Sequence, residues 1–449
     1  MKKYVFTILT LILTTSFVCS QPAIPDTKEA WSHATEIIAR IKAPDFPMRD
    51  FVITNFGAVA GGSNDCSAAI TKAIDACAEA GGGHVVVPAG DFLTGAIHLK
   101  INVDLHLAAT NSVLKFSTDP QAYLPVVFTR FEGTELYNFS SLIYALGQKN
   151  VAVTGEGTLD GQADQSNWLG WSRGAARSKL MKMSDDNVPV EQRQFGAADH
   201  LRPDFIEFNR CENVFVEGVK IRRSPMWEIH PLLCTNVIVR GVDIVSHGAN
   251  NDGCDPESCR DVLIEKCLFD TGDDCIAIKS GRNADGRRVG IPAENIVIRD
   301  CTMRDGHGGV TIGSEISGSC SNVFVENCQM DSPNLTCALR LKNNAMRGGV
   351  LQNIFMRNVN VGVVKDSVLQ IDFLYEEGAK GNFKPVARNV VMENITVART
   401  PRVLNVRGFP EAEISGVWIY NSTFKQINKA DVVEDADVKV VDCVLERNN

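Results

Sequence analysis

The chain has 449 residues, enough for one large domain or two of ordinary size. Its 54 acidic residues outnumber its 45 basic residues, which gives a formal net charge of −9. An acidic balance argues against nucleic acid as a partner, and an anionic ligand would need a local cluster of cations.

The first twenty residues have the composition of a secretory signal peptide. A basic start, MKK, precedes the apolar run YVFTILTLILTTSFV, and the small residues Val18 and Ser20 follow. Removal of residues 1–20 leaves 43 basic and 54 acidic residues, so the mature charge is −11. No other apolar run is long enough to span a bilayer. We expect an exported protein, periplasmic or extracellular, with no membrane span in its mature chain; an N-terminal membrane anchor is the alternative.

Two helices are expected near the N-terminus. The first lies within TKEAWSHATEIIARIKA, in an extension that covers residues 21–50. The second lies within NDCSAAITKAIDACAEAGGG, where Asn64 or Asp65 caps the start and glycines end it. Its apolar face holds residues 69, 70, 73, 74 and 77. Such a helix would cover the open edge of a sheet that follows it.

Residues 51–449 are expected to form one domain, because they contain a repeat. The copies include ENVFVEGVKI at 212, TNVIVRGVDI at 235, RDVLIEKCLF at 260, ENIVIRDCTM at 294 and SNVFVENCQM at 321. Their second position is Asn or Asp, and successive copies begin 23, 25, 34 and 27 residues apart. Repeats of this length indicate a solenoid or a propeller, but these spacings are too short for four antiparallel strands. We predict an all-β fold, a right-handed parallel β-helix of about ten coils with an N-terminal helical cap.

The cysteines follow the repeat. Six residues beyond the Asn column stand Val219, Val242, Cys267, Cys301 and Cys328, so cysteine alternates with valine in one buried column. Although the fourteen cysteines of an exported chain favour disulfides, we expect mostly free thiols in this column. Zinc is not expected, because no paired CxxC motif is present. Whether Cys254 and Cys259 form a local disulfide is left open.

One outer face of the predicted coils collects charged residues. Stacking CIAIK (275) on GVTIG (309) and ALRLK (338) directs Lys279, Arg340 and Lys342 outward, and continues back to Asp273 and His307. In the preceding coil, NNDGCDPES matches TGDDCIAIK, which places Asp252 over Asp273 and Cys254 over Cys275. This alignment predicts a row of Asp252, Asp273, His307 and Arg340 across four coils. Asp274 reaches the same face if the chain bends at Gly272.

Such a cluster has the chemistry of a glycosidase. Carboxylates a few ångströms apart do not all ionise normally, so at least one pKa should rise. A protonated carboxyl serves as a general acid, and ionised neighbours activate water. Arg340 and Lys342, two residues apart on one face, suit a carboxylate on the substrate. The residues therefore predict a hydrolase of an acidic sugar.

Four short motifs, NND, GDD, GHG and RLK, closely resemble the signatures of glycoside hydrolase family 28, the polygalacturonases. They stand in the family's order at residues 250–252, 272–274, 306–308 and 340–342. Asn251 and Leu341 depart from the usual Thr and Ile, and neither removes a charged group. The longer runs HGGVTIGSEISG and GDDCIAIKSGRNADGRR are similar to the exo-acting bacterial branch, and the resemblance covers nearly all of the mature chain.

The resemblance implies a pectin-degrading, inverting hydrolase of α-galacturonosidic bonds that uses no metal or cofactor. Asp273 would be the general acid, Asp252 and Asp274 would activate water, and His307 would tune the site. Galacturonan would be held by the substrate-binding residues Arg340, Lys342, Asn250 and Lys279. A basic insertion between residues 161 and 203 would close one end of the cleft, as exo action requires. We expect the enzyme to act as a monomer.

Other functions remain open from the sequence alone. Within the family, the alternatives are endo-acting polygalacturonase and rhamnogalacturonan hydrolase. A β-helical pectate lyase would depend on calcium and give an ultraviolet-absorbing product. A non-catalytic glycan-binding solenoid would present aromatic platforms, but only 7% of the residues are aromatic. Asp at bends is also common in turns, and Trp227 and His230 fit either the cleft or the core.

Overall fold

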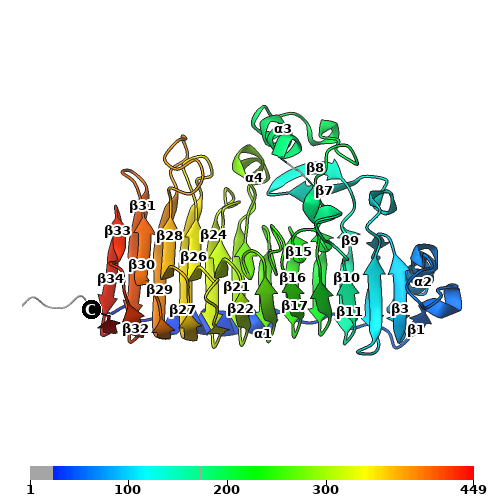
Figure 1. Ribbon diagram of the computed structural model, residues 1–449, viewed down its shortest axis with the longest axis horizontal. Helices are drawn as coiled ribbons and strands as arrows, with labels where there is room; N and C mark the ends of the chain where they lie inside the picture. Colours follow the sequence, from blue (N-terminus) through cyan, green and yellow to red (C-terminus); the bar gives the residue numbers. More distant parts are fainter. Residues whose placement is uncertain (1–23, 172–173, 449) are drawn as a thin grey trace, which may run out of the picture.

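The computed structural model of the chain describes residues 24–171 and 174–448 and contains a right-handed parallel β-helix, seen from the side in Figure 1. The predicted signal peptide lies outside the described residues. Within the described residues, no helix is both long and apolar enough to cross a membrane.

The predicted repeat forms the first of three rows of stacked parallel strands. Its second-position asparagines open each strand, and Asn213 and Asn236 have φ of +57° and +58°. In order along the coil axis the row is β1 (Asp50–Val52), β2 (Gly83–Val87), β5 (Val103–Leu107), β10 (Lys149–Gly155), β13 (Glu212–Glu217), β16 (Thr235–Arg240), β18 (Arg260–Glu265), β21 (Ala293–Arg299), β24 (Cys320–Glu326), β27 (Val350–Val363), β29 (Val386–Arg399), β31 (Glu413–Tyr420) and β34 (Val438–Val441).

The second row follows the first within each coil. β27 and β29 are long enough to run through both rows. The other strands are β3 (Gly90–Thr94), β6 (Ser112–Phe116), β11 (Thr158–Asp160), β14 (Lys220–Arg222), β17 (Asp243–Ser246), β19 (Leu268–Thr271), β22 (Thr302–Asp305), β25 (Gln329–Met330), β32 (Thr423–Ile427) and β35 (Val444–Arg447).

The third row carries the charged face and is interrupted in the middle. Its N-terminal part is β4 (Ile97–His98), β9 (Ile143–Leu146), β12 (Ile206–Asn209) and β15 (Ile229–Leu232). Its C-terminal part is β20 (Ile276–Ile278), β23 (Gly308–Ile312), β26 (Cys337–Lys342), β28 (Ser367–Asp372), β30 (Arg402–Arg407) and β33 (Val432–Glu434). Between them residues 250–257 form only isolated bridges, with Cys254 between Ile229 and Ile276.

The core lies inside the coils and is built by the alternation of side chains along each strand. Val214 and Val216 of β13 stack on Val237 and Val239 of β16, and all four are buried. The same inward positions continue through later coils, so each coil buries a face that it could not bury alone. This column-by-column packing confirms the solenoid that the sequence predicts.

An asparagine ladder runs along the turn that opens row one. Each amide donates to the oxygen of the residue one coil earlier, for example from Asn322 to Asn295 at 2.9 Å and from Asn353 to Asn322 at 3.0 Å. Asparagine tolerates positive φ better than most residues, and its amide can donate and accept at once. These two properties explain why the repeat keeps Asn at this position.

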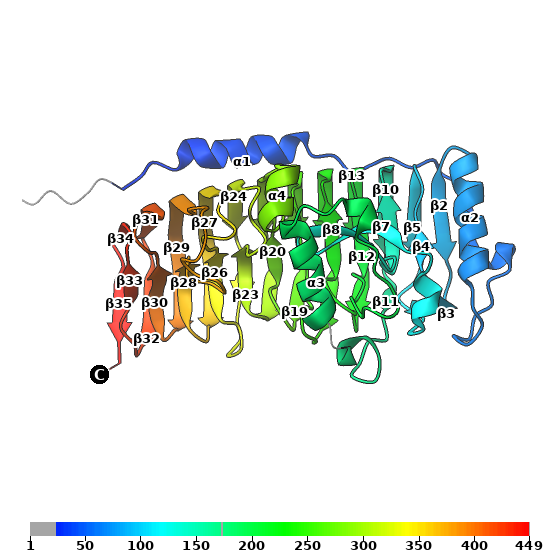
Figure 2. The same cartoon turned by 90° about the horizontal axis from the view of Figure 1, so that it is seen from above.

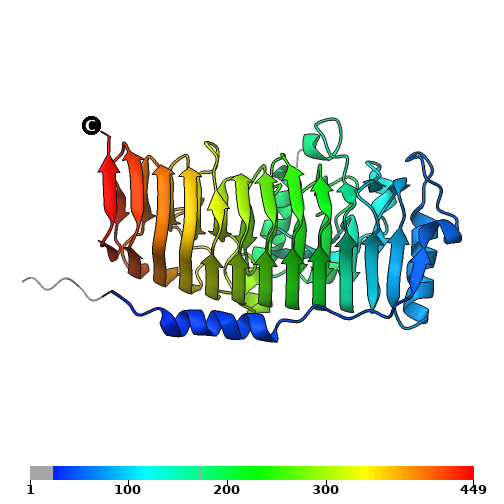
Figure 3. The ribbon, with the colours of Figure 1, turned by 90° about the horizontal axis from the view of Figure 1, so that it is seen from below.

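The ladder is broken where Asp261 replaces asparagine, because a carboxylate has no proton to pass on to Asn236. The N-terminal segment occupies the break: Arg40 Nε donates to Asp261 at 3.0 Å, and the Lys42 backbone N–H donates to Asn236 at 2.9 Å. Helix α1 (Lys28–Arg40) leads to this point along the outside of row one, as Figures 2 and 3 show. It matches the first predicted helix.

An apolar stripe holds α1 against the sheet. Trp31, Ala34 and Ile37 face outward-pointing Phe324 and Phe355 of row one, and all five are buried. Burial of a large apolar side chain stabilises by about 1.5–3 kcal/mol, so the helix is a structural part of the described fold.

Helix α2 (Ser67–Glu79) covers the N-terminal end of the coil, as the sequence predicts (Figure 2). Residues 69, 70, 73, 74 and 77 are buried. The helix starts slightly later than expected: Cys66 occupies the N-cap position, while Asp65 Oδ1 accepts from the Ser67 backbone N–H at 2.9 Å.

Three further helical or hairpin segments rise over the third row in Figure 1. They are the antiparallel hairpin of β7 (Val127–Phe131) and β8 (Thr134–Asn138), helix α3 (Gly174–Asp185) and helix α4 (Asn283–Val289). The basic insertion of the sequence analysis contains α3. The hairpin and α4 were not predicted.

Every cysteine that the structure describes is a free thiol. Cys267, Cys301 and Cys328 lie in the predicted buried column, and a second column contains Cys211, Cys234 and Cys259. Cys254 and Cys259 are both free and buried, which answers the question left open by the sequence. Cysteine serves here as a small buried side chain.

Thiol titration tests these columns. Denatured but unreduced protein should react as thirteen free thiols for the described cysteines, because their side chains run parallel and do not point at one another. The same titration after reduction gives the total as a control. A large increase on reduction would contradict the free-thiol columns.

Candidate active site

Three of the sequence motifs lie on successive coils and are joined through their backbones. The Asp273 N–H donates to Asn251 C=O at 3.2 Å, and the Gly253 N–H donates to Asp274 C=O at 3.0 Å. The His307 N–H in turn donates to Asp273 C=O at 2.9 Å. The parallel stacking therefore brings NND, GDD and GHG together.

The two glycines of GHG are required by close packing. Gly306 has φ of +150°, and a Cβ there would lie 2.6 Å from the Asp273 carbonyl oxygen. A Cβ on Gly308 would lie 2.9 Å from Asp274 Oδ1. Any larger residue would displace the two aspartates that the motif is packed against.

The three aspartates meet as predicted. Asp252, Asp273 and Asp274 each place a carboxylate oxygen within 4.8 Å of the other two. The expected pairing of Cys254 with Cys275 is wrong by one residue, because Cys254 bridges to Ile276. Alternation between faces does not fix the register here, since residues 250–257 form no regular strand. Counting back from this bridge, Asp252 stands opposite Asp274.

Asp274 is fully buried and faces the cations of β26. Its Oδ2 lies 2.7 Å from Lys342 Nζ, and its Oδ1 lies 3.7 Å from Arg340 Nη1. Arg340 also donates through Nε to Gln370 at 2.7 Å. The predicted row is wrong in this part: Arg340 pairs with Thr311, four residues beyond His307, and reaches the aspartates because its side chain is long.

Asp273 and His307 form a hydrogen-bonded pair, with Oδ1 and Nδ1 2.9 Å apart. Burial opposes the charge of Asp273, but the hydrogen bond to His307 and the charge of Lys342 prevail and lower the pKa of Asp273 to about 2. The same hydrogen bond raises the pKa of His307. In the unliganded site, a proton is therefore held on the imidazole and not on Asp273.

Asp252 has the opposite tendency. Burial, followed by the nearby charges of Asp255 and Asp273, raises the pKa of Asp252 well above its ordinary value. Lys279 Nζ, 3.6 Å from Asp252 Oδ2, opposes this change. The raised pKa of Asp252 agrees in direction with the sequence prediction, but burial contributes more to it than crowding by the neighbouring carboxylates.

The two asparagines of NND hold the bend that carries Asp252. Asn251 is buried; its amide donates to Ser224 C=O and Met226 C=O at 3.1 Å each, and its oxygen accepts from Ser246 Oγ. Asn250 has φ of +60° and accepts from Arg202 at 3.1 Å. Asn251, which stands where the family usually has threonine, thus makes three side-chain hydrogen bonds that hold the bend.

Most of the predicted site residues line a cavity of about 390 Å³. The predicted residues that line it are Asn250, Asp252, Asp273, Lys279, His307, Arg340 and Lys342. Sequence reasoning missed the remaining lining residues apart from Trp227: Glu132, Arg177, Ser314, Glu315, Tyr375 and Glu376. Most of these come from loops and insertions, where no repeat pattern identifies them. Of the predicted catalytic residues, only Asp274 lies behind the lining.

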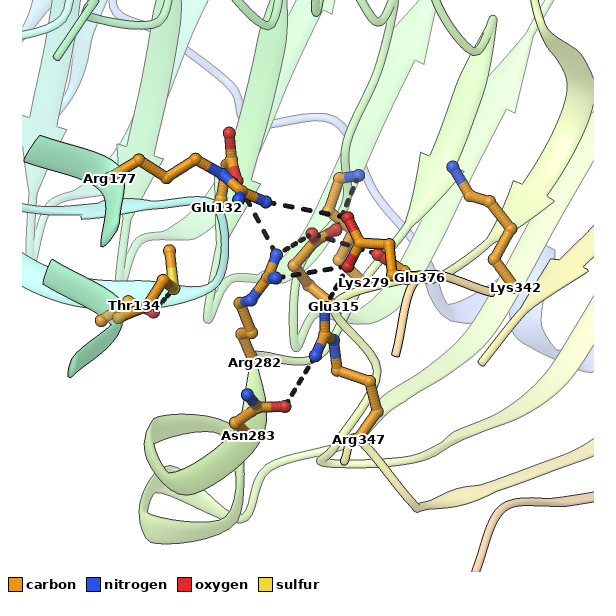
Figure 4. A network of polar contacts seen from close by, with 12 residues as sticks. Glu132, Thr134, Arg177, Lys279, Arg282, Asn283, Glu315, Lys342, Arg347 and Glu376 are labelled. Carbon is orange, nitrogen blue, oxygen red and sulfur yellow. Dashed lines mark hydrogen bonds and ion pairs between the residues drawn. The ribbon is translucent and has the colours of Figure 1, made fainter. Parts of the chain in front are cut away.

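An ionic network joins several of these lining residues to one another and to Arg282 (Figure 4). Arg177 of α3 lies 2.5 Å from Glu132 of the β7–β8 turn and 3.8 Å from Glu376. Arg282 lies 3.3 Å from both Glu315 and Glu376. We call this set, Glu132, Arg177, Arg282, Glu315 and Glu376, the end wall. It joins the hairpin, α3, the segment before α4 and the loop after β28.

Trp227 and His230, which the sequence could not assign to the cleft or the core, lie in different environments. Trp227 lines the cavity and lies under Lys279, whose Nζ is 4.4 Å from the ring centroid. His230 is buried between Asp204 at 2.7 Å and Glu257 at 3.0 Å. Burial opposes its charge, yet these two partners raise the pKa of His230 to about 10. It is a charged core residue.

Two clusters in the described residues combine ligand types that a metal ion could use. One is the aspartate cluster itself, whose charge is already balanced by Lys279, Lys342 and His307 at 3.6 Å or less. The other is His247, Asp270 and Asp305 near the ends of row-two strands, where His247 and Asp270 are 2.7 Å apart.

Comparison with known proteins identifies the family. Residues 77–405 match the model of "Glycosyl hydrolases family 28". The chain belongs to this family. A crystal structure from Thermotoga maritima, described as a hyperthermoactive exopolygalacturonase, is 42% identical in sequence and has a TM-score of 0.88; the match covers 92% of this chain and 96% of that chain.

Two curated relatives are more distant. A "Probable polygalacturonase" of Vitis vinifera is 28% identical over 402 residues, 85% of this chain and 75% of its own length. An "Exo-poly-alpha-D-galacturonosidase" of Dickeya chrysanthemi is 28% identical over 339 residues, 68% of this chain and 54% of the relative.

The His307–Asp273 pair can be tested by titration. His307→Ala should raise the pKa of Asp273 from about 2, because the hydrogen bond to the carboxylate is lost while burial remains. Carbon-13 NMR of labelled aspartate carboxyls measures this change. His247→Ala, which removes the exposed partner of Asp270, is the control. An unchanged Asp273 titration in His307→Ala would show that His307 does not lower its pKa.

Proposed function

We propose that this family 28 hydrolase cleaves α-galacturonosidic bonds of pectin from a chain end, with inversion at the anomeric carbon. One observation carries the proposal: the cavity is lined by Asp252, Asp273, Arg340 and Lys342 and also by Glu132, Arg177 and Glu376, which Arg177 and Arg282 join in an ionic network. We take this network to close one end of the cavity. A wall at one end admits a terminal sugar and prevents a polymer from passing through. The similarity to an exopolygalacturonase over 92% of the chain supports the same reading.

The reaction we propose uses a direct displacement. Asp273 gives a proton to the glycosidic oxygen as its bond to the anomeric carbon breaks. Water attacks that carbon from the opposite face and passes a proton to Asp252, while Asp274 helps to hold the water. In an inverting enzyme the acid and base stand roughly 6.5–9.5 Å apart, which leaves room for this water.

The unliganded site holds its protons in the wrong places for this reaction, since Asp273 is ionised and Asp252 tends to be protonated. A substrate carboxylate bound at Arg340 and Lys342 would offset the positive charge that lowers the pKa of Asp273. Binding would also displace water from its carboxyl. Both changes favour the protonated acid, so the charge of the substrate would assist catalysis as well as binding.

Export and a monomeric state belong to the same proposal. The N-terminal sequence has the features of a signal peptide, and an extracellular or periplasmic location would place the enzyme where pectin fragments are found. The substrate partner would be galacturonan or its oligomers.

Product analysis is the test of exo action and stereochemistry. A time course on galacturonan oligomers should give monomer from the first time point, and proton NMR of fresh product should show the β-anomer. Asp273→Asn, which cannot donate the proton, should lower turnover by about 10²–10⁴-fold and serves as the control. Mixed oligomers at early times would indicate endo action, and a first-formed α-anomer would indicate a retaining mechanism.

Substrate charge gives a second prediction. Methyl esterification should lower kcat/KM by about 10–100-fold, because hydrogen bonds to a charged partner contribute about 1.5–3 kcal/mol. Lys342→Met should weaken the enzyme on the free acid and narrow the difference between free acid and ester.

The four kcat/KM values, for two enzymes and two substrates, form a double-mutant-style cycle. The cycle separates carboxylate recognition from the loss of the 2.7 Å contact with Asp274, which affects both substrates. Lys384→Met is the control, because it removes a cation that is paired with Glu411. It should change kcat/KM on neither the free acid nor the ester. Equal losses on acid and ester would mean that Lys342 does not recognise the carboxylate.

A further inference from the structure

Lys279 is a buried cation enclosed by three carboxylates. Its side chain is 3% exposed, and Nζ lies 3.6 Å from Asp252, 3.4 Å from Asp255 and 3.3 Å from Glu315. The Trp227 ring lies 4.4 Å away. The charge of Lys279 is therefore matched within the protein, unlike that of a cation exposed to receive a substrate.

Glu315 is the least available of these partners, because Arg282 also contacts it at 3.3 Å. Burial opposes its charge, but Lys279 and then Arg282 hold the pKa of Glu315 well below its ordinary value. Because Arg282 and Lys279 share the charge of Glu315, the ammonium group of Lys279 faces two further carboxyl groups, those of Asp252 and Asp255. Both cannot be ionised beside a single ammonium group without strong repulsion.

Asp255 is the carboxyl suited to carry the proton. It is fully buried, and no described residue gives a hydrogen bond to either of its oxygens. An ionised carboxylate in such surroundings is costly. Burial raises the pKa of Asp255 to about 8, against the opposing charges of Lys279 and His230.

Asp252 differs from Asp255 because it lines the cavity, although its Oδ1 likewise accepts no hydrogen bond from a described residue. Other charged and titratable groups on neighbouring coils and strands face Lys279, Asp252 and Asp255. They are Asp204, Glu228, His230, Asp273, Asp274 and Glu315. Of the two cations in this set, Lys279 and His230, Lys279 is the one in contact with Asp252.

We infer that Lys279 is a positioning residue for the water-activating base: its ammonium, 3.6 Å from Asp252, favours the ionised form of that carboxyl, and Asp255 makes this possible by remaining protonated. The inference rests on the proposed function, because it gives Asp252 the role of base. It assigns Lys279 a role through Asp252 in place of direct contact with the substrate.

The sign of the effect follows from the charges. An opposite charge within about 4–6 Å lowers a carboxyl pKa by about 1–3 units. Without Lys279, Asp252 would hold its proton up to a higher pH, and the base would be inactive over a wider acidic range. Neutral Asp255 adds no charge in this range, so its replacement by an isosteric amide would leave the base unaffected.

The test is the pH dependence of kcat/KM for galacturonide hydrolysis. Lys279→Met should move the acidic limb upward by about 1–3 pH units, and its activity loss should shrink as the pH rises. Arg282→Met is the matched control, because it also removes a buried cation 3.3 Å from Glu315 but does not contact Asp252. It should lower activity without moving the limb. Asp255→Asn should leave the limb in place.

Contrary outcomes are distinct. A loss in Lys279→Met by the same factor at every pH would make Lys279 merely structural and overturn the inference. A downward shift in Asp255→Asn would mean that Asp255 is ionised, which also overturns it. A wild-type enzyme that does not hydrolyse galacturonides would instead refute the proposed function.

A spectroscopic measurement does not depend on activity or on the folding of Lys279→Met. Infrared difference spectra at mildly acidic pH, wild type against Asp255→Asn, should show the loss of a protonated carboxylic acid band. Loss of a carboxylate band instead would place the charge on Asp255 and overturn the inference.

Discussion

Repulsion among three aspartates is the constraint on which the site depends. Their oxygens lie within 4.8 Å of one another, and at such distances in a partly buried pocket the charges must be matched or removed. Lys342 matches Asp274 at 2.7 Å, and His307 matches Asp273 at 2.9 Å. Asp252 has the weakest partner, Lys279 at 3.6 Å. The unequal strength of these three pairs separates the protonation behaviour of the carboxyls.

The β-helix can hold such a cluster because each coil is fixed by its neighbours over its whole length. The aspartates lie on adjacent coils whose backbones are hydrogen-bonded through Asn251, Gly253 and Asp273. At the turn that opens row one of these coils, the segment at the end of α1 fills the break in the asparagine ladder at Asp261. The coils that carry the active site are therefore tied at two places, and the stability of the fold supports the strain of the charges.

Much of this arrangement was predictable, because it depends on period and stacking. The asparagine column, the inward valines and the motifs at 250–252, 272–274 and 306–308 all follow the repeat. The register at Cys254 was not predictable, since residues 250–257 contain no regular strand and alternation does not apply. Glu132 and Glu376 have no sequence signal, and for Arg177 the sequence predicts only that its basic insertion lies at the cleft. All three reach the cavity on segments whose position is decided by long-range contacts such as Arg130–Glu257 at 2.9 Å.

The end wall and the aspartate cluster are electrically different, and this difference bears on how a substrate is oriented. In the wall, Arg282 alone contacts four carboxylates, those of Glu132, Glu315, Glu376 and Glu377, at 3.3–3.7 Å. A substrate carboxylate there would compete with the four already present. At the other side, Arg340 uses Nε on Gln370 and lies 3.7 Å from Asp274, which is beyond hydrogen-bonding distance. The terminal nitrogens of Arg340 thus keep hydrogen-bonding capacity, and an anionic sugar gains by placing its carboxylate beside them. That orientation would also bring negative charge close to Asp273, where it would favour the protonated carboxyl that the proposed mechanism requires.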